Sequence, residues 1–452
     1  MSVIDHILNL VPKSADQVAF IHDDLSCSTE QFYELIDEIT NELNNVDVKP
    51  FDRVVLVGDF SAMSLAALVA LIKIKATIIP LTNDSFERLS KNVEDLQPHF
   101  IVRETVNGLG IETRRAVGKA QSVFSMLEKR QASGLVLFTS GTSGKPKAVI
   151  HDFDGLLKKF LNQRRAMVTI NFLLFDHWGG LNTFFHCFAS NCVLVFPRLR
   201  NPDYICELIE KHKIELLPTT PSFLNLLIIS GAIQRYDISS LKLITYGAEP
   251  MPMTTLEMVR KQLPGIELRQ TYGMIEIGVL KAKSKNSDSL WVKIGGEGCD
   301  IRVVDGILQV KSTTTMLGYI GEEMPLTKDG YFITGDAVEQ NGDWLRILGR
   351  KSEIVMVGAE KVYPIEVESV LLKHPHVVDV MVFGERNPIL GNVLCAHVQP
   401  HSSIEAGEKL LEDLRAYASD KLKPYMRPIK YVLNNEIGVG SRAKKVRTAQ
   451  RD

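Results

Sequence analysis

Up to about Ser289, short apolar runs typical of strands alternate with stretches in which apolar residues recur every three to four positions. This order predicts wound α/β layers, in which largely buried strands lie between helices. The predicted strands are Arg53–Val57, Thr77–Pro80, Val193–Phe196, Glu215–Leu217, Leu241–Tyr246 and Ile266–Gln270. The predicted helices between them are Met63–Ala76, Asp203–Lys213, Ser222–Ile229 and Thr254–Leu263.

Beyond Ser289 the pattern changes to short strands separated by turns. Ile301–Val304 and Leu308–Lys311 flank Asp305-Gly306, a pair that favours a tight hairpin turn. This stretch predicts an antiparallel, barrel-like cap on the α/β body.

A second, smaller unit is expected from about Arg350. Pro364 opens a helix that carries Val367, Val370 and Leu371 on one face. Two strands and an amphipathic helix follow, at Val377–Phe383, Val393–Gln399 and Glu408–Leu422. The fold class is therefore α/β: a large N-terminal domain of residues 1–349 with a β-barrel-like subdomain, plus a small α+β C-terminal domain of residues 350–452.

Composition and charge restrict the class of protein to which the chain can belong. The chain has 452 residues, 45% of them hydrophobic, and a net charge of -2, which is typical of a soluble globular protein of more than one domain. The charge indicates no nucleic-acid partner. The amino end lacks a basic start and a sustained apolar core, and Lys73 and Lys75 interrupt the best apolar stretch, so we expect a cytoplasmic protein without a signal peptide or membrane span.

The cysteines and histidines give no clear metal site. The six cysteines contain no C-x-x-C pair, which argues against zinc or a redox dithiol and favours a reduced compartment. His374 and His376 flank Pro375 without an evident third ligand in sequence, so a loop is predicted there rather than a metal site.

Candidate chemistry is concentrated at residues 135–149, LVLFTSGTSGKPKAV. The strand Leu135–Phe138 runs into a loop whose backbone N–H groups can wrap a polyphosphate. Hydroxyls, glycines and positive charges suited to phosphate occur at Thr139, Ser140, Gly141, Thr142, Ser143, Gly144, Lys145 and Lys147. The loop is not a Walker A motif, because Thr139 replaces the first Gly and Pro146 follows Gly144-Lys145. A Ser/Gly-rich linker is the alternative, but linkers rarely follow a buried-type strand.

The string FTSGTSGKPKAV resembles the phosphate-binding signature of the adenylate-forming superfamily of acyl- and aryl-CoA synthetases, stand-alone peptide-synthetase adenylation domains and luciferases. Further segments resemble that family's motifs in the family's order. They are Tyr272-Gly273-Met274-Ile275-Glu276, Thr334-Gly335-Asp336, and Gly349-Arg350 with Gly358 and Glu366-Val367-Glu368. Together they span most of the chain.

The resemblance implies a mobile C-terminal domain that swings over a cleft, with a hinge at about residues 349–352 that includes Ser352. It also implies that a carboxylate attacks the α-phosphate of ATP, a step that depends on positioning and on positive charge. The family places a catalytic lysine near its C-terminus. Aligning the tail IGVGSRAKKVRTAQR backwards from Arg447 assigns this role to Lys444 in preference to Lys445.

Other roles follow from the same resemblance. Tyr272, followed by Gly273, would stack on adenine, and Gly247, Ala248 and Glu249 would line the base site. Asp336 would accept hydrogen bonds from the ribose hydroxyls. Arg350 would fix ribose or phosphate, Glu276 would hold Mg²⁺ and act in catalysis, and Gly358 would line a tunnel for the thiol.

The acid pocket is expected around Asp176, His177, Trp178, Gly179, Gly180 and Tyr246. His177 resembles the family's catalytic His beside the acyl group, and the two glycines would leave room for the acid. Trp178 would either wall a short pocket or be a core aromatic. Asp176 is alternatively a partner for a substrate amine.

Two positions depart from the family pattern. Ile275 stands where a Thr usually contacts the α-phosphate, and Ser352 stands where the hinge usually has Asp or Lys. These departures predict slow turnover or an altered hinge.

The expected function is that of an ATP-dependent acid–thiol ligase using ATP and Mg²⁺, with CoA as co-substrate. One alternative is an enzyme that loads the phosphopantetheine arm of a carrier protein, and another is a non-catalytic sensor of acyl ligands and nucleotide. A luciferase-like oxygenase is a third alternative. The sequence leaves open whether the protein is a monomer or a homodimer, and which acid it takes.

Overall fold

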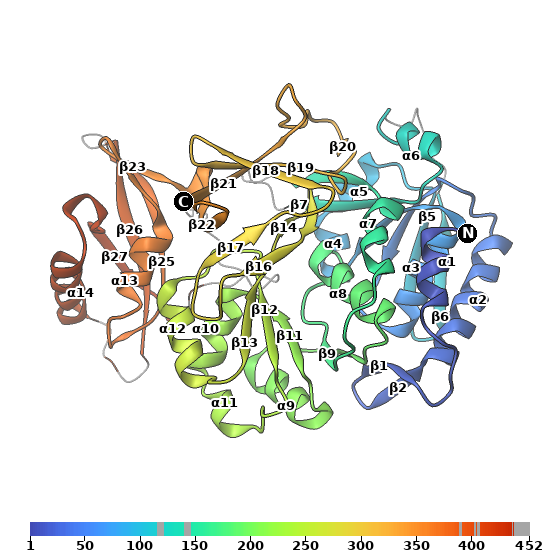
Figure 1. Ribbon diagram of the computed structural model, residues 1–452, viewed down its shortest axis with the longest axis horizontal. Coiled ribbons are helices and arrows are strands. Elements are labelled where there is room, and N and C mark those ends of the chain that lie inside the picture. Colours follow the sequence, from blue (N-terminus) through green and yellow to red (C-terminus); the bar gives the residue numbers. More distant parts are fainter. Residues whose placement is uncertain are drawn as a thin grey trace.

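The computed structural model describes residues 1–114, 122–139, 146–387, 391–401, 404, 407–435 and 437. Two seven-stranded sheets with their helices form the body of the large domain, and an antiparallel sheet lies against them (Figure 1). The small C-terminal unit lies beyond this sheet, next to α12. The architecture confirms the predicted fold class.

The first seven-stranded sheet has the order β20-β8-β7-β4-β3-β5-β6. Its strands are β3 (Arg53–Val57), β4 (Thr77–Leu81), β5 (Phe100–Thr105), β6 (Gly108–Thr113), β7 (Gly134–Thr139), β8 (Lys147–Asp152) and β20 (Gly318–Tyr319). Its helices are α3 (Ala62–Ile74), α4 (Asn83–Arg88), α5 (Ser90–Asp95), α6 (Ser125–Arg130), α7 (Phe153–Leu157) and the 3-10 helix η1 (Lys158–Leu161). Every residue of β3 and β4 is buried, as expected for central parallel strands covered on both faces.

The second seven-stranded sheet has the order β13-β12-β11-β9-β10-β1-β2. Its strands are β1 (Val18–His22), β2 (Leu25–Ser28), β9 (Thr169–Ile170), β10 (Leu194–Phe196), β11 (Leu216–Thr219), β12 (Leu243–Tyr246) and β13 (Glu267–Gln270). The associated helices are α1 (Val3–Asn9), α2 (Thr29–Asn45), α8 (Trp178–Ala189), α9 (Pro202–His212), α10 (Pro221–Ile229), α11 (Ala232–Arg235) and α12 (Met253–Gln262). β9 to β13 are parallel, so their carboxyl ends meet at one edge.

A proline lies near the carboxyl end of a central strand in each of these sheets. Pro218 in β11 follows the single paired position between β11 and β9, at Leu216. Pro80 in β4 likewise follows the last paired position with β7, at Ile78. Since proline cannot donate to a strand ladder, both sheets open along one strand pair toward the carboxyl edge.

The antiparallel part begins with the two-stranded pair β14 (Tyr272–Met274) and β15 (Gly278–Leu280). A six-stranded sheet follows, in the order β16-β17-β22-β21-β19-β18. Its strands are β16 (Ala282–Ser284), β17 (Trp291–Ile294), β18 (Cys299–Val304), β19 (Ile307–Ser312), β21 (Phe332–Asn341) and β22 (Trp344–Arg350). Asp305 and Gly306 both have positive φ, 51° and 74°, and form the predicted hairpin turn between β18 and β19.

The C-terminal unit has its own hydrophobic core around a three-stranded sheet of order β25-β26-β27. Its elements are η2 (Lys351–Glu353), β23 (Val355–Val357), β24 (Glu360–Val362), α13 (Pro364–Leu371), β25 (Val377–Asn387), β26 (Gly391–Pro400), α14 (Glu408–Lys421), η3 (Pro424–Met426) and β27 (Lys430–Leu433). It touches the large domain through ion pairs of Lys373 with Glu257, at 3.1 Å, and of Arg346 with Glu366, at 3.4 Å.

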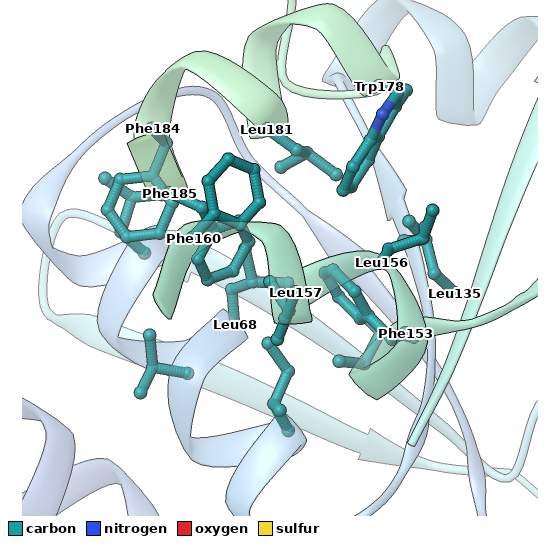
Figure 2. Packing of buried hydrophobic residues seen from close by; sticks show 14 of the residues in the cluster. Leu68, Leu135, Phe153, Leu156, Leu157, Phe160, Trp178, Leu181, Phe184 and Phe185 are labelled. Carbon is teal, nitrogen blue, oxygen red and sulfur yellow. The ribbon is translucent and has the colours of Figure 1, made fainter. Parts of the chain in front are cut away.

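The largest core cluster joins the two α/β sheets. Phe153, Leu156 and Leu157 of α7 pack against Trp178 and Leu181 of α8 (Figure 2). The rings of Phe153 and Trp178 meet edge to face, with centroids 6.2 Å apart. In the part of the chain that the structure describes, no helix has both the length and the apolar character needed to cross a membrane.

Candidate functional site

Three residues from distant parts of the chain meet where β14, β21 and β22 come together. The Tyr272 hydroxyl donates to Asp336 Oδ2 at 2.6 Å, and Arg350 Nε lies 3.1 Å from Asp336 Oδ1. Arg350 Nη1 also donates to the carbonyl of Thr334 at 2.8 Å. Asp336 and Arg350 are register partners in the β21–β22 ladder, which explains why residues 14 positions apart face each other.

Burial shapes the electrostatics of this group. It raises the pKa of Tyr272 well above its usual range, and the neighbouring Asp336 carboxylate raises it further, so Tyr272 stays a hydrogen-bond donor. Burial alone would lower the pKa of Arg350, but the negative charges of Asp336, Glu276 and Glu353 outweigh it and the pKa is raised. The group therefore holds a permanent cation beside a carboxylate.

Glu276 lies next to this group, in the turn between β14 and β15. The Tyr319 hydroxyl donates to its Oε1 at 2.9 Å, and the Met316 N–H donates to its backbone carbonyl at 2.7 Å. Among the described residues, no hydrogen bond reaches the second carboxylate oxygen. Lys147 Nζ lies 5.3 Å from the centre of the Tyr319 ring and forms an ion pair with Glu322. Tyr319 thus links the end of the phosphate-binding signature to Glu276.

His151 of β8 is hydrogen-bonded to the residue that precedes Glu276. Its Nε2 lies 2.6 Å from the carbonyl oxygen of Ile275, and its ring is buried. Burial lowers the pKa of His151 to about 4, so the neutral ring donates its Nε2–H to that carbonyl. The Ile275 side chain itself lies in the core.

The signature loop connects β7 and β8, which pair from Gly134 opposite Asp152 to Thr139 opposite Lys147. Thr139 and Lys147 therefore face each other at the mouth of the loop. The other predicted phosphate-binding residues, Ser140, Gly141, Thr142, Ser143, Gly144 and Lys145, lie outside the described residues, and so does the predicted catalytic Lys444.

The segment Gly247-Ala248-Glu249 follows the end of β12. A Cβ on Gly247 would lie under 3.0 Å from Thr271, so only glycine permits this approach of the two strand ends. Ala248 has a φ of 71°, a strained value for a residue with a side chain, and such strain is often kept at ligand sites. Glu249 Oε1 accepts the Ser222 N–H at 2.6 Å, which ties the segment to the start of α10.

Gln270 is a polar residue that the sequence did not single out. It ends β13 as the register partner of Tyr246 and precedes Tyr272 by two residues. Its side chain is buried, and Oε1 has no hydrogen-bond partner among the described residues. A buried amide oxygen without a donor is costly unless a ligand supplies one.

The residues predicted for the acid pocket lie around the start of α8, but several have contacts within the protein. His177 is the N-cap of α8, and its Nδ1 accepts the Gly179 N–H at 3.0 Å. Trp178 is 2% exposed and packs in the core. A Cβ on Gly180 would lie under 3.0 Å from the Leu174 carbonyl oxygen. The space that this glycine leaves is therefore occupied by the protein's own backbone.

Asp176 and Tyr246 are both buried. Asp176 Oδ2 accepts a hydrogen bond from the Ser85 hydroxyl of α4, and Arg200 lies close enough to interact with its charge. These contacts compensate Asp176 from within the chain, without a substrate amine. Tyr246 packs in the core cluster beneath α10 and α12, at the end of β12.

The residues predicted for the hinge and the thiol tunnel form no part of the Tyr272–Asp336–Arg350 group. Ser352 lies in η2, two residues after Arg350. Gly358 is at the exposed tip of the β23–β24 hairpin, with a φ of 61° and nothing within 4 Å of a Cβ built on it. In this arrangement of the two domains the hairpin tip faces solvent, and the tunnel role stays a prediction.

His374 and His376 form a cluster with Asp413 of α14 whose possible ligand atoms lie within 4.8 Å of one another. His374 Nδ1 accepts the His376 N–H at 3.2 Å, and its Nε2 lies 3.2 Å from Asp413 Oδ2. This places the ring proton on Nε2, where a metal would need a lone pair. The structure therefore adds a third candidate ligand, Asp413, that the sequence did not show, and a loop rather than a metal site stays a prediction. All six cysteines are free thiols.

The structure thus brings together Lys147, Tyr272, Glu276, Asp336 and Arg350, which sequence reasoning had named. It adds Tyr319, His151 and Gln270, which occur as single residues within strands and carry no local signal. Tyr272, Asp336 and Arg350 can hold a polar, donor-rich ligand. Lys147 can meet an anion, and the Glu276 carboxylate is an oxygen ligand of the kind that Mg²⁺ prefers.

Comparison with known families gives two matches along the chain. A family model described as AMP-binding enzyme matches residues 10–320, and one described as AMP-binding enzyme C-terminal domain matches residues 366–438. The indoleacetate–CoA ligase of Aromatoleum aromaticum is 30% identical over 309 residues, which cover 61% of this chain and 59% of that enzyme. The 2-succinylbenzoate–CoA ligase of Bacillus cytotoxicus is 26% identical over 435 residues, covering 88% and 87% of the two chains.

Solved structures share the whole fold. The anthranilate CoA ligase AuaEII in complex with anthranoyl-AMP has a TM-score of 0.81 at 17% identity, covering 98% of this chain and 95% of that one. The o-succinylbenzoate CoA synthetase of Bacillus subtilis in complex with OSB-AMP has a TM-score of 0.77 at 20% identity, covering 100% and 98%. Both have a large α/β domain followed by a small C-terminal domain.

Proposed function

The chain belongs to the family of AMP-binding enzymes, and the relatives named above are aryl- and acyl-CoA ligases, so we propose that it is an ATP-dependent acid–CoA ligase. In the first half-reaction the acid's carboxylate oxygen attacks the α-phosphorus of ATP, giving acyl-AMP and pyrophosphate. In the second, the thiol of CoA attacks the acyl carbon, and AMP leaves. The observation that carries this proposal is the Tyr272–Asp336–Arg350 group beside Glu276 and Lys147.

Each member of the group has a matching part of ATP. Asp336 can take both ribose hydroxyls, because a carboxylate accepts several hydrogen bonds, and Tyr272 and Arg350 keep it oriented. Gln270 Oε1, which has no hydrogen-bond partner among the described residues, suits the amino group of adenine, which donates. Lys147 would exchange its ion pair with Glu322 for one with phosphate. Glu276, with one carboxylate oxygen unengaged among the described residues, would hold Mg²⁺, which neutralises phosphate charge when bound.

The chemical step then depends on positive charge at the α-phosphate. We propose that Lys444 supplies it, as the resemblance of the tail implies, and that His177 lies beside the acyl group. Oriented cations of this kind stabilise the charge that develops on the phosphoryl oxygens without having to reorganise. Asp176 is a weak candidate for a substrate amine, because Ser85 and Arg200 already compensate it.

The test is pyrophosphate release with ATP and Mg²⁺ across aliphatic, aryl and amino acids, each with and without CoA. Release that rises with CoA for one class of acid supports the ligase. Release that is indifferent to CoA but rises with a phosphopantetheinylated carrier protein favours carrier loading. ATP binding without release on any acid favours the sensor.

A matched pair of variants tests the lysine. Lys444→Ala should abolish acid-dependent pyrophosphate release while thiol transfer from supplied acyl-adenylate continues. Lys445→Ala, its neighbour, should leave both half-reactions within a few-fold of the unmodified protein. Equal loss of both half-reactions in Lys444→Ala would contradict the assignment.

A further inference from the structure

The Tyr319 side chain contacts two charged residues of the candidate site. Its hydroxyl lies 2.9 Å from Glu276 Oε1, and Lys147 Nζ lies 5.3 Å from the centre of its ring. An ionised carboxylate can only accept hydrogen bonds, so the hydroxyl is the donor. Tyr319 therefore touches both the carboxylate expected to hold a cation and the lysine expected to meet phosphate.

One strand, β8, positions both partners of this hydrogen bond. Tyr319 is the register partner of Val149 in the pairing of β20 with β8. His151, two residues further along β8, is hydrogen-bonded to the carbonyl of Ile275, directly before Glu276. Because the backbones on both sides are tied to the same strand, the hydrogen bond holds the Glu276 carboxylate in one rotation.

This hydrogen bond leaves the second carboxylate oxygen of Glu276 for another partner. Over the described ranges of the chain, no hydrogen bond reaches Oε2 and no ion pair involves Glu276. Arg350 lies close enough for its charge to interact with Glu276, but its hydrogen bond goes to the Thr334 carbonyl and its ion pair is with Asp336. Oε1 is thus engaged within the protein and Oε2 is not.

The number of oxygens that a carboxylate offers distinguishes Mg²⁺ from Ca²⁺. Mg²⁺ is small, demands near-octahedral geometry, and in nucleotide sites is bound by one or two carboxylates together with phosphates and waters. Ca²⁺ takes about six to eight oxygens and accepts both oxygens of one carboxylate. A Glu276 whose Oε1 accepts from Tyr319 therefore suits the smaller ion.

We propose that Tyr319 is a positioning residue that restricts Glu276 to one metal-binding oxygen and so makes the site prefer Mg²⁺ over Ca²⁺. This inference rests on the proposed function, in which Glu276 holds a divalent cation beside the phosphates of ATP. It assigns the choice of that cation to a side chain that acts through Glu276.

Nucleotide binding tests this role without turnover. Calorimetry on the full chain measures the dissociation constant of an ATP analogue whose α,β bridge cannot be cleaved, at saturating Mg²⁺, at saturating Ca²⁺ and with EDTA. Tyr319→Phe removes the hydroxyl and keeps the ring that contacts Lys147. Tyr331→Phe is the matched control, because the Tyr331 hydroxyl also donates to a carboxylate, that of Asp300.

The unmodified protein should bind the analogue more tightly with Mg²⁺ than with Ca²⁺. In Tyr319→Phe the ratio of the two dissociation constants should fall roughly tenfold, the usual value of a hydrogen bond to a charged group, because Glu276 can then offer both oxygens to Ca²⁺. Tyr331→Phe should keep the unmodified ratio.

Two changes at Glu276 separate positioning from a general structural effect. In a Glu276→Gln background, Tyr319→Phe should change the ratio no further, because Tyr319 acts through this carboxylate. Glu276→Asp draws the carboxylate away from the hydroxyl and should lose the preference while Tyr319 is intact, so it tests the inference even if Tyr319→Phe does not fold.

Other outcomes overturn the positioning role. A ratio that is unchanged in both Tyr319→Phe and Glu276→Asp refutes it and leaves the ligase intact, because pyrophosphate release would still depend on acid. A fall of equal size in Tyr331→Phe, or in the Glu276→Gln background, refutes it as well. Binding that is as tight with EDTA as with Mg²⁺ shows that Glu276 holds no cation, and a complete lack of analogue binding contradicts the proposed function together with this inference.

Discussion

Buried His151 should make the stability of the large domain depend on pH. The pKa of its ring falls from about 6.5 in the unfolded chain to about 4 in the folded protein, because burial disfavours the charged form. A depressed folded pKa contributes stability that is present above about pH 6.5 and lost as the pH falls toward 4. Between pH 7 and pH 5 the linkage relation gives a loss of about 2 kcal/mol in the free energy of unfolding from this group.

The perturbation is His151→Gln, which keeps a neutral N–H donor for the Ile275 carbonyl but cannot be protonated. Its free energy of unfolding should fall by about 2 kcal/mol less than that of the unmodified protein between pH 7 and pH 5. His186, whose pKa is also lowered to about 4 by burial, contributes equally to both proteins and cancels in the difference. His22→Gln, at an exposed strand position, is the control.

Urea unfolding followed by tryptophan fluorescence is the assay. The chain has three tryptophans, Trp178, Trp291 and Trp344, and all lie before residue 350, so the signal reports the large domain. The reasoning fails if the unmodified protein and His151→Gln lose the same stability on acidification. It also fails if His22→Gln changes the pH dependence as much as His151→Gln does.

Two further predictions concern the site and its scaffold. Tyr272→Phe removes the 2.6 Å hydrogen bond to Asp336, so the KM for ATP in pyrophosphate release should rise about tenfold or more; an unchanged KM would show that Asp336 needs no such orientation. Gly180→Ala drives a Cβ into the Leu174 carbonyl and should lower the free energy of unfolding by about 1–3 kcal/mol. Gly110→Ala, where the nearest atom is 3.5 Å away, should change it by less than about 0.5 kcal/mol, and equal effects would contradict the packing argument.

The sequence predicted where helices and strands begin and end better than it predicted which of them pack against each other. The alternation of apolar runs located β3, α9, α10 and α12 to within two residues. Elements that are buried on one face or on both leave a repeating pattern of apolar residues, and this pattern is visible in a single sequence. The tight turn at Asp305-Gly306 could also be predicted, because Asp and Gly are among the few residue types that adopt the positive φ that such a turn requires.

Residues that act across long separations could not be found in the same way. Tyr319 reaches Glu276 and His151 reaches Ile275 only because β8 and β20 pair in one sheet. Trp178 could be a pocket wall or a core residue by sequence, and the packing of α7 against α8 places it in the core. Such outcomes depend on tertiary contacts, which periodicity does not encode.

The prolines at the carboxyl ends of β4 and β11 have a consequence for how such a protein can diversify. Because each sheet has already stopped pairing along one side when it reaches Pro80 or Pro218, the segments beyond do not support the sheet's hydrogen-bond ladder. Only one residue, Thr82 or Thr220, separates each strand from the helix that follows, α4 or α10, and its side chain caps that helix. Variation at this edge is therefore confined to side chains, because a change in the length of either connection would displace a capped helix.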